Sequence, residues 1–219
     1  GEGALVRPEM GGPVPPHPPA TVLGCYKVPR TWIPWIRQKW MCRIKIAAWN
    51  IQRGRQSHLE MACRALIRMS VDLCFLTKAK LTEGRHTWSS HGYQVVATEA
   101  ASHRQGGIAL VWKESLQWQV ESWKCHGPNV LSCLLVSGKR RTPLVGVYIP
   151  PEDTTTLVHI ENALNRFNEG RYQPPILLGD LNIKDLEAPE GARDAEIAAL
   201  VASYGLLNMY NHFRQRRYN

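Results

Sequence analysis

The sequence predicts an α/β fold, a layered sandwich of mixed β-sheets with helices on the outer faces. Three observations support this prediction. A strand–helix–strand pattern spans residues 44–77, a run of short apolar segments separated by turns spans residues 93–149, and two helical segments follow that run. A strand–helix–strand unit implies parallel pairing, whereas strands joined by short turns imply antiparallel pairing, so we expect both kinds of pairing in one domain.

The chain changes character near residue 41, which divides it into two parts. Residues 1–40 include a stretch rich in proline and glycine at 11–19, which cannot form a helix or a sheet ladder, and three tryptophans mixed with Arg37 and Lys39 at 31–40. We interpret residues 1–40 as an N-terminal extension that is either flexible or bound to a partner; a segment that packs back on the domain is the alternative. Residues 41–219 are expected to form the folded domain.

The elements of the domain follow from hydrophobic periodicity and turn residues. Residues 44–50 are expected to form a buried strand, residues 57–60 have the spacing of a helix capping box, and residues 71–77 are expected to form the next strand. Five more strands are expected at 93–98, 107–112, 116–123, 130–136 and 144–149. The remaining elements are a helix at 154–168, a strand at 175–179 and a helix at 194–203.

Polar side chains stand at the ends of three of these strands. Asn50 ends the first strand, Tyr148 lies near the end of the strand at 144–149, and Asp180 and Asn182 follow the strand at 175–179. Asp180 and Asn182 lie on the same side of an extended chain because side chains alternate with a period of two. Ligands of open α/β sheets gather at strand ends, so we expect these four side chains to share a site that binds a divalent cation or orients a water molecule.

Five short motifs occur in an order and at a spacing that resemble a known family. They are WNIQ at 49–52, FLT at 75–77, GGIAL at 106–110, VYIPP at 147–151 and LGDLN at 178–182. Together they resemble the endonuclease/exonuclease/phosphatase superfamily, above all the endonuclease domain of non-LTR retrotransposons, which is related to apurinic/apyrimidinic endonucleases. The resemblance covers residue 43 to about residue 218. It implies a DNase I-like fold and Mg²⁺-dependent hydrolysis of phosphodiester bonds.

The resemblance also implies a role for each matching residue. Asn50 and Asp180 would contact the metal ion, and Tyr148 would donate a hydrogen bond to the scissile phosphate. Asp180 would also position or deprotonate the attacking water, while Asn182 would orient the phosphate or that carboxylate. Mg²⁺ would neutralise the charge that develops during in-line attack.

One departure from the family pattern weakens the implied metal site. The family carries a metal-binding Glu shortly after the second strand, but residues 76–81 read LTKAKL, so Lys78 stands in its place. An ammonium about 4 Å from a dication repels it by roughly 8 kcal/mol at an effective dielectric constant near 20. Glu83 lies too far along the loop to substitute. We therefore expect poor Mg²⁺ binding, with Lys78 in the metal position and paired with Asp180.

A second departure lies at the C-terminal end. Members of the family continue with further strands and a final Ser-Asp-His motif, whereas this sequence ends at Asn219 and no Asp precedes His212. We therefore expect a domain that is incomplete at its C-terminus. Its unpaired sheet edge or uncovered core would be available to a protein partner.

The net charge of +9 is concentrated at the two ends of the chain. Residues 1–45 carry a net charge of +5, and Arg214, Arg216 and Arg217 give residues 211–219 a net charge of +3, which leaves +1 for residues 46–210. Basic ends favour polyanions through phosphate contacts. These three arginines are therefore candidate substrate-binding residues for nucleic acid, with DNA expected rather than RNA; a pair of solvated tails is the alternative.

The cysteines and the hydropathy pattern bear on the cellular location. The six cysteines form no CxxC pair and have no histidine at zinc-like spacing, which indicates free thiols rather than disulfides. We therefore expect an intracellular protein of a reducing compartment, in the nucleus or the cytoplasm. No apolar run is long enough to span a bilayer, and the first twenty residues show no secretory signal.

Three functions fit this sequence. We favour a degenerate or partial Mg²⁺-dependent phosphodiesterase domain, weak or inactive as this chain, that serves as a binding or structural subunit. Lys78 and the missing C-terminal motif are the reasons for this choice. The alternative is an active Mg²⁺-dependent endonuclease that nicks DNA. A phospholipid or inositol phosphate phosphatase of the same fold is the third, and the basic ends and retrotransposon-like motifs count against it.

Overall fold

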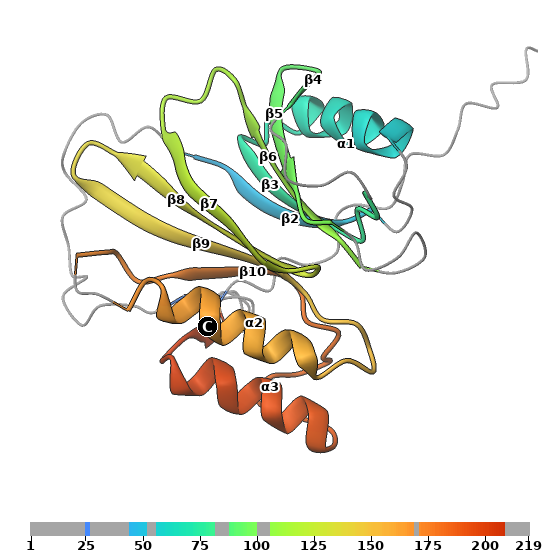
Figure 1. The fold of residues 1–219 in the computed structure, drawn as a ribbon, viewed down its shortest axis with the longest axis vertical. Coiled ribbons are helices and arrows are strands. Elements are labelled where there is room, and N and C mark those ends of the chain that lie inside the picture. Colours follow the sequence, from blue (N-terminus) through green and yellow to red (C-terminus); the bar gives the residue numbers. More distant parts are fainter. Residues whose placement is uncertain are drawn as a thin grey trace, which may run out of the picture.

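The computed structural model describes residues 25–26, 44–51, 56–81, 88–99, 106–168 and 171–208. These residues form four layers, which are one helix, a five-stranded sheet, a six-stranded sheet and two further helices (Figure 1). Each sheet contains parallel and antiparallel pairs. The α/β sandwich of mixed sheets that the sequence predicts is therefore confirmed.

The six-stranded sheet has the strand order β11-β1-β10-β9-β8-β7. Its strands are β1 (Cys25–Tyr26), β7 (Gln119–Gly127), β8 (Val130–Ser137), β9 (Arg140–Tyr148), β10 (Ile176–Asp180) and β11 (Leu207–Asn208). Strands β7, β8 and β9 form the antiparallel meander that their short turns predict, and β10 pairs with β9 in parallel. The parallel register places Asp180 opposite Tyr148, so β9 and β10 end side by side.

The five-stranded sheet has the strand order β2-β3-β6-β5-β4. Its strands are β2 (Ile46–Asn50), β3 (Leu73–Thr77), β4 (Trp88–Ser90), β5 (Tyr93–Ala97) and β6 (Ile108–Lys113). Strands β2 and β3 are parallel because the helix α1 (Gln56–Arg68) crosses between them. Their register places Asn50 opposite Thr77 at the end of the pair.

Helix α1 covers the outer face of the five-stranded sheet (Figure 1). Leu59, Cys63 and Leu66 recur at helical spacing along α1, and all three are buried against the sheet beside Cys74 and Tyr93. Full burial of one large apolar side chain stabilises a fold by about 1.5–3 kcal/mol. This apolar stripe is therefore enough to explain why a helix of this length lies on the sheet.

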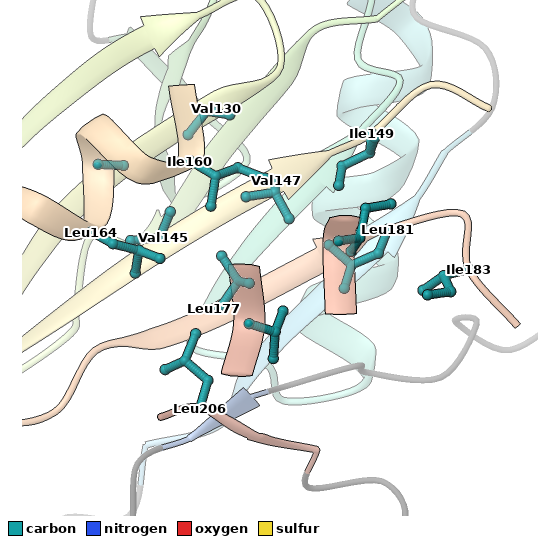
Figure 2. Close-up of a cluster of buried hydrophobic side chains, with 13 residues drawn as sticks. Val130, Val145, Val147, Ile149, Ile160, Leu164, Leu177, Leu181, Ile183 and Leu206 are labelled. Atoms are coloured by element: carbon teal, nitrogen blue, oxygen red, sulfur yellow. The ribbon is translucent and has the colours of Figure 1, made fainter. Parts of the chain in front are cut away.

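Helices α2 (Thr155–Asn165) and α3 (Ala192–Ser203) cover the outer face of the six-stranded sheet. Figure 2 shows the cluster of buried side chains between them and the sheet, in which Ile160 and Leu164 of α2 meet Val145 and Val147 of β9 and Leu177 of β10. The crossover from β9 to β10 runs through α2, so this cluster fixes the relative position of the two strands that end at Tyr148 and Asp180.

The second large cluster of buried side chains lies between the two sheets. Phe75 of β3 is fully buried there with Leu144 of β9 and Leu178 of β10. The ring of Phe75 lies directly over Gly146, where an added Cβ would be 2.0 Å from a ring carbon. Gly146 therefore leaves the space that lets the two sheets approach each other at this point.

Three short strands, β1, β4 and β11, are not predicted by the periodicity of the sequence. Each contains only two or three residues, which is too short for an alternating pattern to appear. Strand β1 lies within residues 1–40 and pairs with β10 and β11, so this part of the N-terminal segment contributes to the six-stranded sheet. Residues 1–24 and 27–43 lie outside the described residues, and the proposed extension at 1–40 stays a prediction.

Two further properties concern the described residues as a set. No helix among them has the length and hydrophobicity that crossing a bilayer requires. Among them, Cys63, Cys74 and Cys133 are buried free thiols. Burial raises the pKa of the Cys63 thiol to about 11, so this thiol is neutral and unreactive at physiological pH.

Candidate functional site

The candidate site lies at one end of the core between the two sheets. Along each central strand the side chains that face the opposite sheet occupy every second position, and the last such position is polar. On β2 the polar residue Asn50 comes two positions after Ala48, and on β3 Thr77 comes two positions after Phe75. In the same way, Tyr148 comes two positions after Gly146 on β9, and Asp180 comes two positions after Leu178 on β10. The alternation that builds the apolar core therefore also brings these polar groups to one place.

A hydrogen bond joins the end of β2, in one sheet, to the end of β10, in the other sheet. The side-chain amide of Asn50 donates from Nδ2 to Oδ2 of Asp180 over 2.7 Å, although the two residues are 130 positions apart in the sequence. The distance is typical of a charge-assisted hydrogen bond to a carboxylate. The structure thus places Asn50 and Asp180 together, as expected for a shared site.

Asn182 holds the segment that follows Asp180. Its backbone N–H donates to Oδ1 of Asp180 over 3.1 Å, and its side-chain Nδ2 donates to the carbonyl of Ile149 over 2.7 Å. The φ angle of Asn182 is 48°, a left-handed conformation that asparagine tolerates better than most residues. Both carboxylate oxygens of Asp180 therefore accept a hydrogen bond from an asparagine.

The phenol of Tyr148 completes the predicted set. Tyr148 is 5% exposed, and its side chain hydrogen-bonds with the side chain of Asn182. Burial raises the pKa of Tyr148, the nearby Asp180 carboxylate raises it further, and the hydrogen bond with Asn182 partly offsets these effects. The phenol therefore keeps its proton at neutral pH and can donate it in a hydrogen bond to an anion.

Gly179 explains how Asp180 comes so close to β9. Its φ angle is 146°, and a Cβ at this position would lie 1.8 Å from the carbonyl oxygen of Val147. Only glycine fits that backbone conformation and that approach. The glycine immediately before Asp180 is thus required by the geometry of the strand end.

Lys78 is the cation of the site. It follows β3 directly, is half-buried, and has a left-handed φ angle of 57°. The backbone N–H groups of Ala79 and Lys80 donate to the carbonyls of Gly107 and Gly106, which holds this turn against the start of β6. The Nζ atom of Lys78 lies over the ring of Tyr148, 5.4 Å from its centroid, in the arrangement of a cation–π contact.

The expected pairing of Lys78 with Asp180 is not found. Of the ion pairs between described residues, none involves Lys78, whose ammonium contacts the Tyr148 ring instead. Amide donors of Asn50 and Asn182 occupy the positions facing the two oxygens of Asp180, one hydrogen bond to each. Lys78 thus has no ion-pair partner among the described residues.

Thr77 lies at the site and Arg193 lies behind it, and the sequence predicts neither. The hydroxyl of Thr77 is buried opposite Asn50 and has no hydrogen-bond partner among the described residues. Threonine is common in strands, so its presence in an apolar run carried no signal. Arg193 lies at the start of α3, where an arginine resembles an ordinary surface charge, and only its contacts reveal its role.

The residues present do not fit a Mg²⁺ site of the implied kind. No group of three or more His, Cys, Asp and Glu side chains comes together in the part of the chain that the structure describes. Asp180 is the carboxylate of the site, both its oxygens accept hydrogen bonds, and an ammonium lies over the neighbouring phenol. Mg²⁺ is usually held by one or two carboxylates together with waters, and the described residues of this site offer a single carboxylate and a nearby ammonium that repels a dication.

Several residues named in the sequence lie outside the described residues. These are the candidate substrate-binding residues Arg214, Arg216 and Arg217, together with Glu83 and His212. Their roles stay predictions.

A second polar cluster lies away from this site, beneath α2. His126 of β7 is within 2.8 Å of the hydroxyl of Ser132, which also accepts a hydrogen bond from Arg166, while Nδ1 of His159 is buried without a partner among the described residues. The pKa of His126 is lowered to about 4, mainly by burial and also by the charges of Lys124, Arg166 and His159. His126 is therefore neutral at physiological pH.

Comparison with solved structures identifies the fold. The endonuclease domain of TRAS1, a telomere-specific non-LTR retrotransposon, superposes with a TM-score of 0.56 at 15% identity, over 74% of this chain and 72% of that domain. An AP endonuclease from Archaeoglobus fulgidus gives 0.53 at 13% identity, over 74% and 70%. The AP endonuclease LMAP from Leishmania major gives 0.54 at 16% identity, over 74% and 66%.

Comparison at the level of sequence finds no relative of this chain among family models or curated proteins. At these identities the structural likenesses establish the fold alone. The layered sandwich is thus a DNase I-like fold, similar to that of these endonucleases.

Proposed function

We propose that this chain uses its DNase I-like fold to bind a nucleic-acid backbone at the site formed by Asn50, Lys78, Tyr148 and Asp180, and that Mg²⁺-dependent cleavage by this chain is weak or absent. The observation that carries the proposal is the position of Lys78, whose Nζ lies 5.4 Å from the Tyr148 ring centroid and is not paired with Asp180. A site that pairs an ammonium with a protonated phenol has the donors that a phosphodiester requires.

Electrostatics favours a phosphate over a metal ion at this position. A dication about 5 Å from an ammonium is repelled by about 7 kcal/mol at an effective dielectric constant near 20, and solvent around a half-buried lysine reduces this figure. A phosphodiester, which carries one negative charge, is attracted at the same distance by about half as much, about 3 kcal/mol before the same reduction by solvent. Exchanging a carboxylate for a lysine therefore reverses the preferred charge of the ligand.

The rest of the chain supports a polyanionic ligand. The net charge of +9 attracts nucleic acid, and we extend the proposal to Arg214, Arg216 and Arg217 as further phosphate contacts. Two of the structural neighbours are AP endonucleases and a third is a retrotransposon endonuclease domain, which favours DNA over RNA as the partner.

Fluorescence anisotropy with a labelled DNA duplex in EDTA tests the proposal directly. We expect binding without any divalent ion, weakened by Lys78→Gln and by Tyr148→Phe. The slope of log K against log salt should become less steep by about 0.9 in Lys78→Gln, as for the loss of one phosphate contact. Lys139→Gln is the matched control, because Lys139 is exposed in the β8–β9 turn at the opposite end of β9 from Tyr148.

Two results would overturn the proposal. One is the absence of DNA binding by the full chain in EDTA. The other is equal affinity and equal salt slope for the wild-type protein, Lys78→Gln and Lys139→Gln, since the lysine of the site would then be no different from a surface lysine.

An active Mg²⁺-dependent DNA-nicking endonuclease is the second candidate. The convergence of Asn50, Tyr148, Asp180 and Asn182 favours it, because these are the residue types that the family resemblance links to catalysis. Incubation with supercoiled plasmid in Mg²⁺ and in EDTA decides between the two. Nicking that requires Mg²⁺ and is lost in Asp180→Asn would establish the enzyme and replace the proposal of weak or absent activity.

A further inference from the structure

The guanidinium of Arg193 lies behind the candidate site and contacts both of the segments that carry it. Arg193 is the second residue of α3, and its side chain is only 19% exposed. Its Nη2 donates to the carbonyl of Pro150 over 3.1 Å and to that of Leu181 over 3.3 Å. Its Nη1 donates to the carbonyl of Asn182 over 3.1 Å.

The fourth contact balances the charge. Nη1 of Arg193 also donates to Oδ1 of Asp194 over 3.0 Å, and the side chain of Asp194 is 16% exposed. All four hydrogens on the two Nη atoms are therefore used, three on backbone carbonyls and one on a carboxylate. A planar guanidinium can reach several acceptors at fixed angles, whereas the single ammonium of a lysine cannot span them.

The three carbonyls lie where the sheet stops holding the two strands together. The paired register of β9 and β10 ends at Tyr148 and Asp180, and one more backbone bond follows, from the N–H of Ile149 to the carbonyl of Asp180 over 2.9 Å. The side-chain amide of Asn182 then donates to the carbonyl of Ile149, and no further backbone pair of this ladder follows among the described residues. Pro150 is two residues after Tyr148, and Leu181 and Asn182 directly follow Asp180, so Arg193 joins the two segments immediately beyond the ladder.

We propose that Arg193 is a positioning residue that sets the Asn182 amide and the Asp180 carboxylate against the end of β9. It acts through the backbone, since its contacts are to the carbonyls of the two segments and not to Asn50, Tyr148 or Asp180 themselves. The proposal uses the geometry of the candidate site and does not require that nucleic acid binds there. Helix α3 thereby becomes part of the support of the site, although it lies on the outer face of the sheet.

Amide hydrogen exchange, monitored by NMR in the full chain, tests whether Arg193 holds the ends of β9 and β10 in position. In Arg193→Gln we expect exchange of the Ile149 N–H and the Asn182 side-chain amide to become about tenfold faster or more, because local opening of the strand ends governs these protons. The N–H of Leu178, in the middle of β10, should keep its protection. Arg193→Lys keeps the charge beside Asp194 and should resemble Arg193→Gln, since an ammonium cannot reach the three carbonyls.

Arg166→Gln is the matched control for general destabilisation. Arg166 is partly buried and hydrogen-bonds to Ser132 beneath α2, away from the site. A residue that only stabilises the fold would change the exchange of Ile149 and Leu178 together, as we expect for Arg166→Gln. The proposal is overturned if Arg193→Gln accelerates exchange of the Ile149 N–H and the Leu178 N–H equally. It is also overturned if these protons exchange in Arg193→Lys as they do in the wild-type protein. Should Arg193→Gln fail to fold, the milder Arg193→Lys decides the question by the same two protons.

DNA affinity provides a second reading that is independent of the first. If the proposed function holds, Arg193→Lys and Tyr148→Phe should each weaken binding, and the double variant should be little weaker than either, because both disturb one arrangement. Absence of DNA binding by the wild-type protein would remove the proposed function, while the exchange measurement would still decide the role of Arg193.

Discussion

Reversing the charge at residue 78 is the sharpest test of how the site selects its ligand. Lys78→Glu would place a second carboxylate beside Asp180, and Lys78→Gln would remove the ammonium without adding a ligand. Taking about 5 Å as the separation between residue 78 and a dication held by Asp180, the interaction with one unit charge is about 7 kcal/mol at an effective dielectric constant near 20. Lys78 and Asp180 both lie beside Tyr148, the first over its ring and the second opposite it in the β9–β10 register.

Solvent lowers that figure because Lys78 is half-buried. We retain about 2 kcal/mol for the repulsion and the same for the attraction by a glutamate, which is twice the roughly 1 kcal/mol at the upper end for exposed pairs of unit charges, because the ion carries two charges. Lys78→Gln should then bind Mg²⁺ about 30-fold more tightly than the wild-type protein, and Lys78→Glu about 1,000-fold more tightly. The order of the three affinities is the prediction, and the two steps should be of similar size.

Isothermal titration calorimetry with MgCl₂ at constant ionic strength measures the three dissociation constants. Lys139→Glu makes the same change of net charge in the exposed β8–β9 turn and should bind Mg²⁺ like the wild-type protein. Tight Mg²⁺ binding by the wild-type protein, at or near the affinity of Lys78→Glu, would refute the reasoning. An equal gain in Lys139→Glu would refute it as well, because the effect would then be one of net charge.

Three further predictions concern stability. Gly179→Ala should lower the free energy of unfolding by about 3 kcal/mol or more, because its Cβ would meet the Val147 carbonyl in a backbone conformation reserved for glycine; urea denaturation measures it, and a loss below about 1 kcal/mol would contradict the described strand end. Phe75→Ala should cost about 3–5 kcal/mol in the same assay, since the ring is fully buried between the sheets, and a near-neutral effect would show that the sheets pack differently. His126, whose pKa is lowered to about 4, stays neutral in the folded protein while the unfolded chain takes up a proton below about pH 6.5. Stability should therefore fall as the pH drops from about 6.5 to 4, and thermal unfolding of His126→Gln should show a smaller fall; identical pH profiles would rule out this histidine as the cause.

The sequence was informative wherever one local pattern determines one structural outcome. Alternating apolar residues located the long strands and the ends at Asn50, Tyr148 and Asp180, because the period of two that fills the core also decides which polar side chain follows it. The short strands β1, β4 and β11 escaped this reasoning, since two or three residues cannot show a period.

Features that depend on distant contacts could not be predicted. Arg193 finds its carbonyl partners on two other segments, and the sequence around it reads as the first turn of a helix. The ammonium of Lys78 was expected on Asp180 and lies over Tyr148 instead, while amide groups of Asn50 and Asn182 donate to the carboxylate. Which donors meet a carboxylate is decided in the assembled site and has no trace in the sequence.

The hydrogen bond from Asn50 to Asp180 crosses from one sheet of the sandwich to the other. A bond of this length tolerates displacements of a few tenths of an ångström, so it breaks when one sheet slides over the other by less than the width of a methyl group. We therefore expect changes deep in the sandwich, around Phe75, to disturb the geometry of the site at temperatures where the chain is still folded. Conversely, the ligand that we propose for this site should stabilise the alignment of the two sheets and raise the melting temperature.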